Sequence, residues 1–139
     1  MKIAFLTEMN FRSKIPANHP NMRTEFAWMH ALNADHYNIV DWKFVMDYDY
    51  VFIIFPKGVV CLNSVGCRLT NNTNHYSNLL AEPIVSTLKF KNKFVCSIQE
   101  GPTWYVNDFE LQDQFNFYNQ LSECDILFSH NQYDLNWYK

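Results

Sequence analysis

YDYVFIIFP, residues 48–56, is the stretch of this sequence that most directly indicates the fold. The core of the stretch, VFIIF at 51–55, is entirely apolar, and Pro56 ends the run. A strand that is apolar at consecutive positions is buried on both faces, as is usual for a strand of a parallel sheet covered by helices. The stretch therefore predicts the centre of an α/β domain.

Strand-like and helix-like segments alternate along the rest of the chain. Further strands are predicted at 2–6, 36–42, 93–98 and 125–130, and helices at 22–33, 79–90 and 106–124. A long polar excursion is expected at 57–78. This alternation predicts one domain over residues 1–139, a Rossmann-like three-layer sandwich with a mostly parallel sheet of about five strands and helices on both faces.

The helix predicted at 106–124 has apolar residues at helical spacing. They are Leu111, Phe115, Tyr118 and Leu121. This spacing supports the helix prediction. Asn107 and Glu110 have the spacing of a capping box at the start of the helix.

The composition argues against several classes of site. The chain has three glycines, and TEMNFRSKIP after the first strand has none, so a dinucleotide-binding turn or a P-loop is excluded there. A net charge of −3 disfavours general nucleic-acid binding and leaves a local patch at Lys89, Lys91 and Lys93 open. The cysteines and histidines lack metal-ligand spacing, so we expect no metal site and interpret the cysteines as core residues.

We expect no membrane association. The longest apolar run, VFIIF, is far shorter than the roughly 20 residues of a membrane span. MKIAFL at 1–6 begins like a signal peptide but becomes polar at Thr7 and Glu8, too early for a secretory apolar region. The expected location is cytoplasmic.

Polar residues follow the carboxyl ends of the predicted strands, where open α/β sheets bind their ligands. The candidate site residues at these positions are Thr7, Glu8, Asn10, Arg12, Lys57, Gly58, Glu100, Gly101, Trp104, His130 and Asn131. Carboxylates and amides can bind hydroxyl groups, and the ring of a tryptophan can cover the apolar face of a sugar or base. This edge is therefore expected to bind a hydroxyl-rich molecule.

The same residues also have structural interpretations that the sequence leaves open. Glu100 can be a solvated turn residue, and Gly101 belongs to a Gly-Pro turn. Trp104 can be a hydrophobic staple at a helix start, and His130 can bond to nearby backbone. Ser129 and His130 are adjacent and point in opposite directions in a strand, so a Ser–His hydrolase pair is disfavoured, and no G-x-S-x-G elbow occurs.

Essentially the whole chain resembles the N-terminal half of GT-B glycosyltransferases, and in particular the glycosyltransferases of large tailed bacteriophages. The stretches that carry the resemblance are MKIAFLTEMNFRSKIPANHPNMRTEFAWM (1–29), VFIIFPKG (51–58) and QEGPTWYVNDFELQDQFNFYNQLSECDILFSHNQYDLNWYK (99–139). In this superfamily the last strand of the N-terminal domain carries a short pattern to which Asp125–Ile126, Ser129–His130–Asn131 and Asp134 correspond.

The resemblance implies two Rossmann-like domains that face each other across a cleft. The N-terminal domain mainly holds the acceptor, and the C-terminal domain binds the nucleotide-sugar. The 139 residues contain only the first, so we expect no cofactor in this chain, a nucleotide-sugar donor only together with the C-terminal donor domain, and an inactive chain by itself.

The resemblance also implies a reaction at the strand ends. Inverting transfer needs a carboxylate that takes the proton of the acceptor hydroxyl; Glu100 is the first candidate and Glu8 the second. Arg12 or Lys57 could offset the charge on the departing phosphate. The acceptor can be a modified base in phage DNA, although the acidic pI argues mildly against it, or a glycan or small molecule, in the host cytoplasm if the protein is phage-encoded.

A non-catalytic role is the main alternative. The chain would then be a Rossmann-like binding or assembly module, phage-encoded and homodimeric, with an exposed apolar patch where the second domain would dock. A reading frame that continues past Lys139 into a second α/β domain would favour the transferase.

Overall fold

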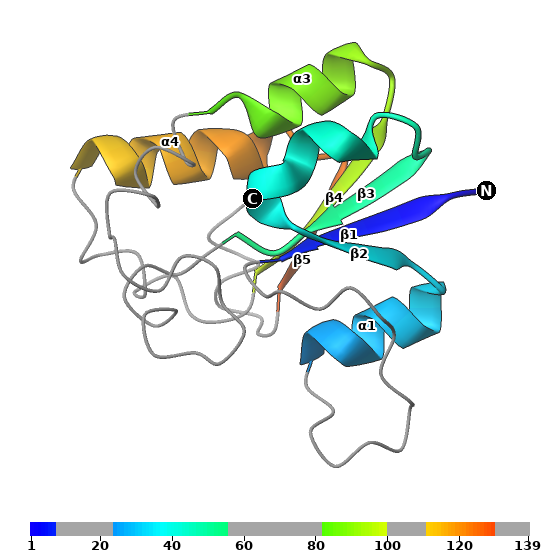
Figure 1. Ribbon diagram of the computed structural model, residues 1–139. Helices are drawn as coiled ribbons and strands as arrows, with labels where there is room; N and C mark the ends of the chain where they lie inside the picture. The colour runs from blue at the N-terminus through cyan, green and yellow to red at the C-terminus, as the bar shows by residue number, and fades with distance from the viewer. Residues whose placement is uncertain (8–23, 56–81, 100–110, 130–139) are drawn as a thin grey trace.

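The computed structural model describes residues 1–7, 24–55, 82–99 and 111–129, and its centre is a five-stranded parallel sheet (Figure 1). The strands are β1 (Ile3–Thr7), β2 (Asp35–Asn38), β3 (Tyr50–Ile53), β4 (Phe94–Gln99) and β5 (Ile126–Ser129). Their spatial order is β2-β1-β3-β4-β5, and every neighbouring pair is parallel.

Helices lie on both faces of this sheet (Figure 1). Helix α1 (Thr24–Leu32) covers one face, where Phe5, Met29 and Phe52 share a core cluster. The 3₁₀ helix η1 (Ile39–Val45) and helices α3 (Ile84–Phe90) and α4 (Leu111–Ser122) lie on the other, over a larger core that includes Leu6 and Leu88. The predicted α/β Rossmann-like fold class is thus confirmed.

The strands β1 and β3 are buried on both faces of the sheet. In β1, Ala4, Phe5 and Leu6 are fully buried at consecutive positions, and in β3 Val51 and Ile53 are fully buried. The rings of Phe5 and Phe52 stack across the strand pair with centroids 6.3 Å apart. The prediction made from residues 48–56 is therefore confirmed: β3 lies between β1 and β4.

Two predicted helices are shorter in the described part of the chain. The helix predicted at 22–33 is described from Thr24, since residues 22–23 lie outside the described ranges, and it ends at Leu32, before Asn33 with its left-handed φ of 52°. The helix predicted at 79–90 begins at Ile84, because Pro83 directly before it has a non-helical ψ of 63°. Residues 79–81 lie outside the described ranges.

The strand predicted at 36–42 is wrong beyond Asn38. The side chain of Asn38 accepts a hydrogen bond from the backbone N–H of Val40 at 3.0 Å, which caps η1 and turns the chain out of the sheet. Ile39, Trp42 and Val45 are the buried residues of η1. Their spacing of three residues matches the period of a 3₁₀ helix, and the non-helical dihedrals of Asp41 divide η1 into two short turns.

The predicted helix α4 is present, but only part of its apolar stripe is buried. Phe115 is 62% exposed and Leu111 is largely exposed, whereas Phe117 is only 2% exposed and Leu121 is buried. The buried face is set by Phe117, which packs against Phe55 with centroids 6.1 Å apart. The predicted capping box at residues 107 and 110 lies outside the described part.

The cysteines of the described part have the core environment that the sequence predicted. Cys96 is buried and Cys124 half-buried, and both are free thiols. Burial raises the pKa of Cys96 to about 11 and that of Cys124 to about 12. Such thiols are protonated and unreactive at neutral pH. Among the described helices, none is both long and apolar enough to cross a membrane.

Candidate functional site

The carboxyl edge of the sheet is the natural place to look for a ligand site. From β1 the chain goes to β2 on one side, and it then returns to β3 on the other side of β1. The strand order therefore reverses between β1 and β3, and in open α/β sheets ligands bind outside the strand ends at such a reversal. The backbone links these two strand ends directly, because the N–H of Ile54 donates to the carbonyl of Leu6 at 3.0 Å.

A pair of buried polar side chains lies at this edge, on the face covered by α1. The hydroxyl oxygen of Thr7, the last residue of β1, is 2.7 Å from Nε2 of His36 on the neighbouring strand β2. Thr7 is 2% exposed and His36 is 9% exposed. Asn38, which is also buried, ends β2 in register with Thr7.

The electrostatic state of His36 follows from its burial. Desolvation lowers the pKa of the imidazole to about 4, because the charged form loses its hydration. His36 is therefore neutral at pH 7, and the corner formed by Thr7, His36 and Asn38 is uncharged. Such groups can hydrogen-bond hydroxyls and amides, but they supply no positive charge for a phosphate.

Of the site residues predicted from sequence, Thr7 alone belongs to the described part of the chain. Its side chain is buried and hydrogen-bonded to His36 of β2, so Thr7 is a structural link between β1 and β2. The other candidates lie outside the described residues and stay predictions: Glu8, Asn10, Arg12, Lys57, Gly58, Glu100, Gly101, Trp104, His130 and Asn131. Sequence analysis missed His36, since its partner is known only from the register that pairs β1 with β2.

The sheet does fix where the segments carrying these candidates leave the strands. Adjacent strands lie about 4.8 Å apart, so the carboxyl ends of β1 and β5 are separated by about 14 Å along the edge. The strand preceding Glu8 neighbours the strand preceding Lys57, and the strand preceding Glu100 neighbours the strand preceding His130. The candidates thus fall into two adjacent pairs of strand ends.

A groove lies in the helix layer, between α3 and α4. It has a volume of about 140 Å³, and its lining residues are Glu82, Pro83, Ser86, Asn116, Asn119, Gln120 and Glu123. Gln120 is buried; its amide nitrogen donates to the carbonyl of Glu82 at 2.6 Å, and its amide oxygen accepts from the N–H of Val85 at 3.0 Å. Because Pro83 offers no side-chain cap, Gln120 of α4 caps the start of α3 in its place.

The same joint is reinforced from η1. The indole N–H of Trp42 donates to the carboxylate of Glu82 at 2.6 Å. This bond and the two bonds of Gln120 tie η1, α3 and α4 together on one face of the sheet. The groove is therefore the outer surface of a structural joint, and its hydrogen bonds explain the local architecture without a ligand.

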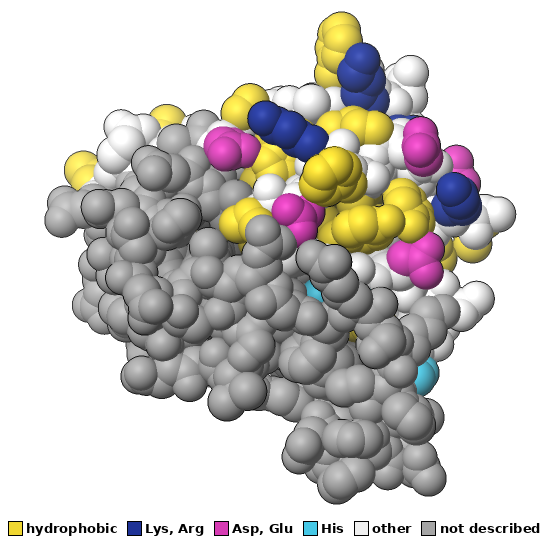
Figure 2. Space-filling model, in the orientation of Figure 1, with side chains coloured by type: hydrophobic (Ala, Val, Ile, Leu, Met, Phe, Trp, Pro, Cys, Tyr) yellow, Lys and Arg dark blue, Asp and Glu magenta, His cyan; other side chains and the backbone are white. Residues whose placement is uncertain are grey.

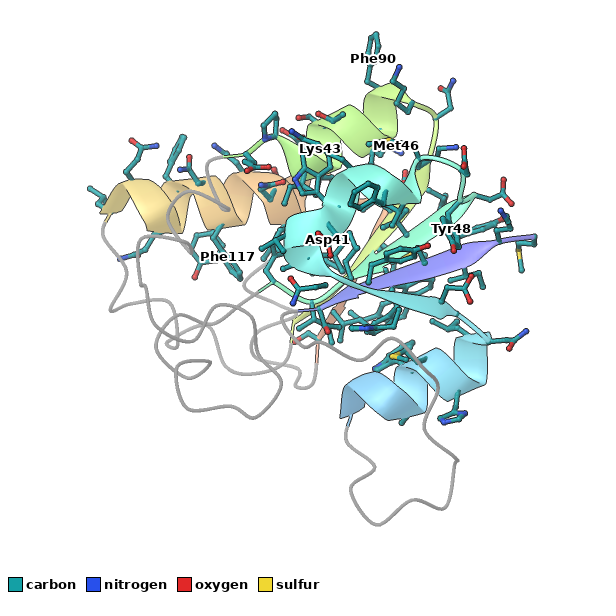
Figure 3. All side chains as sticks on the ribbon, viewed as in Figure 1. Asp41, Lys43, Met46, Tyr48, Phe90 and Phe117 are labelled. Carbon is teal, nitrogen blue, oxygen red and sulfur yellow. The ribbon has the colours of Figure 1, made fainter. Side chains whose placement is uncertain are left out.

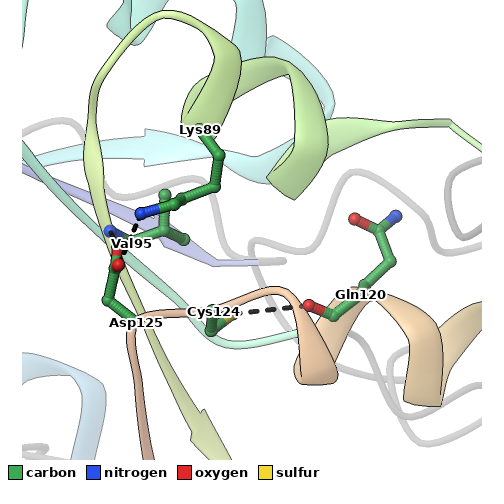
Figure 4. Close-up of polar contacts among 5 residues, drawn as sticks. All are labelled: Lys89, Val95, Gln120, Cys124 and Asp125. Carbon is green, nitrogen blue, oxygen red and sulfur yellow. Dashed lines mark hydrogen bonds and ion pairs between the residues drawn. The ribbon is translucent and has the colours of Figure 1, made fainter.

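Asp125 forms another joint, at the start of β5 (Figure 4). Its carboxylate pairs with the ammonium group of Lys89 on α3 and accepts from the N–H of Val95 on β4 at 2.9 Å. Burial by itself raises the pKa of this carboxyl group, but the bonds from Lys89 and Val95 outweigh it and lower the pKa below its usual value. The aspartate that carried part of the family resemblance thus has an architectural role here.

Two further observations concern metal binding and the relation of this chain to known proteins. In the described ranges, no cluster of three or more His, Cys, Asp or Glu side chains could hold a metal ion. Comparison of the chain with protein-family models, curated proteins and solved structures gives no match. The functional argument therefore rests on the fold and on the chemistry of the residues.

Proposed function

We propose that this domain binds an acceptor molecule at the carboxyl edge of its sheet, as the acceptor-side half of a glycosyltransferase. The observation that supports the proposal is the strand order β2-β1-β3-β4-β5, with its reversal between β1 and β3. This is the flavodoxin-like doubly wound order, which has the same kind of reversal as the Rossmann order 3-2-1-4-5-6 but lacks its strand beyond β2. The fold is thus compatible with the Rossmann-like N-terminal domain that the resemblance implies.

The reversal changes the ranking of the candidate bases. Glu8 and Arg12 follow β1, Lys57 follows β3, and Glu100 follows β4, one strand further from the reversal. We therefore propose Glu8 as a candidate base equal in weight to Glu100. The base takes the proton of the acceptor hydroxyl while that oxygen bonds to the anomeric carbon, and the bond from this carbon to the nucleoside diphosphate breaks. Arg12 or Lys57 would offset the charge on the departing diphosphate.

The described side chains at the corner of β1 and β2 supply no positive charge for a diphosphate. Thr7 and Asn38 are neutral side chains, and burial keeps the imidazole of His36 uncharged at pH 7. A diphosphate is normally bound by cationic side chains or by a glycine-rich turn at a helix start. The segment after β1 has no glycine, so under this proposal the donor is bound by a second domain.

Thermal unfolding of the chain with a ligand panel tests the proposal. The panel contains methyl glycosides, hydroxymethylated nucleosides and UDP-glucose. A ligand of the folded state at 100 times its Kd stabilises it by about 2.7 kcal/mol. We expect a rise in Tm with at least one acceptor-type compound and none with UDP-glucose; the reverse pattern would overturn the proposal.

Matched variants locate the site along the edge. Asn10→Ala alters the segment next to the reversal, whereas Asn131→Ala alters the segment after β5, at the other end of the edge. If the acceptor binds at the reversal, Asn10→Ala abolishes the ligand-dependent rise in Tm and Asn131→Ala leaves it intact. Loss only in Asn131→Ala would move the site to the β4–β5 end.

The exposed aromatic side chains favour a second candidate, a non-catalytic binding or assembly module. Hydrophobic side chains gather over η1 and α3 on the face drawn in Figure 2. Phe44 of η1 and Phe90 at the end of α3 are largely exposed, and Phe90 projects away from the sheet (Figure 3). Light scattering after size exclusion tests this candidate: a dimer that Phe90→Ser dissociates supports it, and a monomer at high concentration rejects the homodimeric form.

A further inference from the structure

We draw no further inference here: the strongest candidate, the apolar surface patch of Phe94 and Ile126 on the α1 side of strands β4 and β5, leaves 39% and 41% of these residues exposed, and nothing among the described residues shows what covers it.

Discussion

Mild acid should destabilise this domain through His36. The imidazole has an ordinary pKa of 6.5, and burial lowers the pKa to about 4 in the folded state. Between these two values the unfolded chain binds a proton that the folded chain does not, so the free energy of unfolding falls as the pH falls. The full difference of 2.5 pKa units corresponds to about 3.4 kcal/mol, and the loss between pH 7.5 and 4.5 is about 2.5 kcal/mol.

Urea unfolding, followed by tryptophan fluorescence, measures this loss at about pH 7.5, 6.5, 5.5 and 4.5. His36→Gln removes the titrating group and keeps an amide that can bond to Thr7. Its pH profile should be flatter than the wild-type profile by about 2.5 kcal/mol over this range. Thr7→Ser keeps the hydroxyl beside His36 and is the matched control, with the wild-type slope.

A direct titration completes the test. The Cε1 proton signal of His36 in the folded protein should change with a midpoint near pH 4. A midpoint close to 6.5 would show that the imidazole is solvated. Equal pH slopes for the wild type and His36→Gln would likewise refute the reasoning, because the destabilisation would then come from other groups.

Three further perturbations test the packing of the helices. Gln120→Leu removes the acceptor of the buried Val85 N–H, whereas the carbonyl of Glu82 keeps its bond from the N–H of Ile84. It should lower the free energy of unfolding by about 1–3 kcal/mol; a loss below about 0.5 kcal/mol would contradict its capping role. Phe117→Ala should cost about 3–5 kcal/mol and Phe115→Ala less than about 0.5 kcal/mol, and equal losses in urea unfolding would contradict the assigned face of α4. Asp125→Asn should cost at most about 1 kcal/mol at pH 7, because the ion pair is partly exposed. Since the folded-state pKa of Asp125 is lowered, the difference between wild type and variant should decrease as the pH falls through that pKa. A difference that does not decrease as the pH falls below the usual value of 3.8 would count against the ion pair.

The helix α4 shows the limit of reading a buried face from spacing. Leu111, Phe115, Phe117, Tyr118 and Leu121 are all apolar or aromatic, and they fit more than one helical stripe. The partners choose between the stripes: Phe117 meets Phe55, and Gln120 meets the start of α3. Neither partner can be identified from the sequence of α4 itself.

The candidate site, too, could be predicted from the sequence only in part. The strand ends and their polar residues could be located from the sequence, since a strand-like run followed by polar residues is a local pattern. The reversal between β1 and β3 could not, because strand order depends on which side of β1 each crossover takes. His36 was missed for the same reason: its burial and its bond to Thr7 depend on the pairing of two strands that are far apart in the chain.

The sequence by itself determined that this protein is an α/β domain with a central buried strand, because consecutive apolar residues and the alternation of strands with helices are local properties. Tertiary structure alone decided the strand order, the inward face of α4 and the neutral state of His36. Each of these depends on contacts between distant segments, because side chains are removed from water only when those segments pack together.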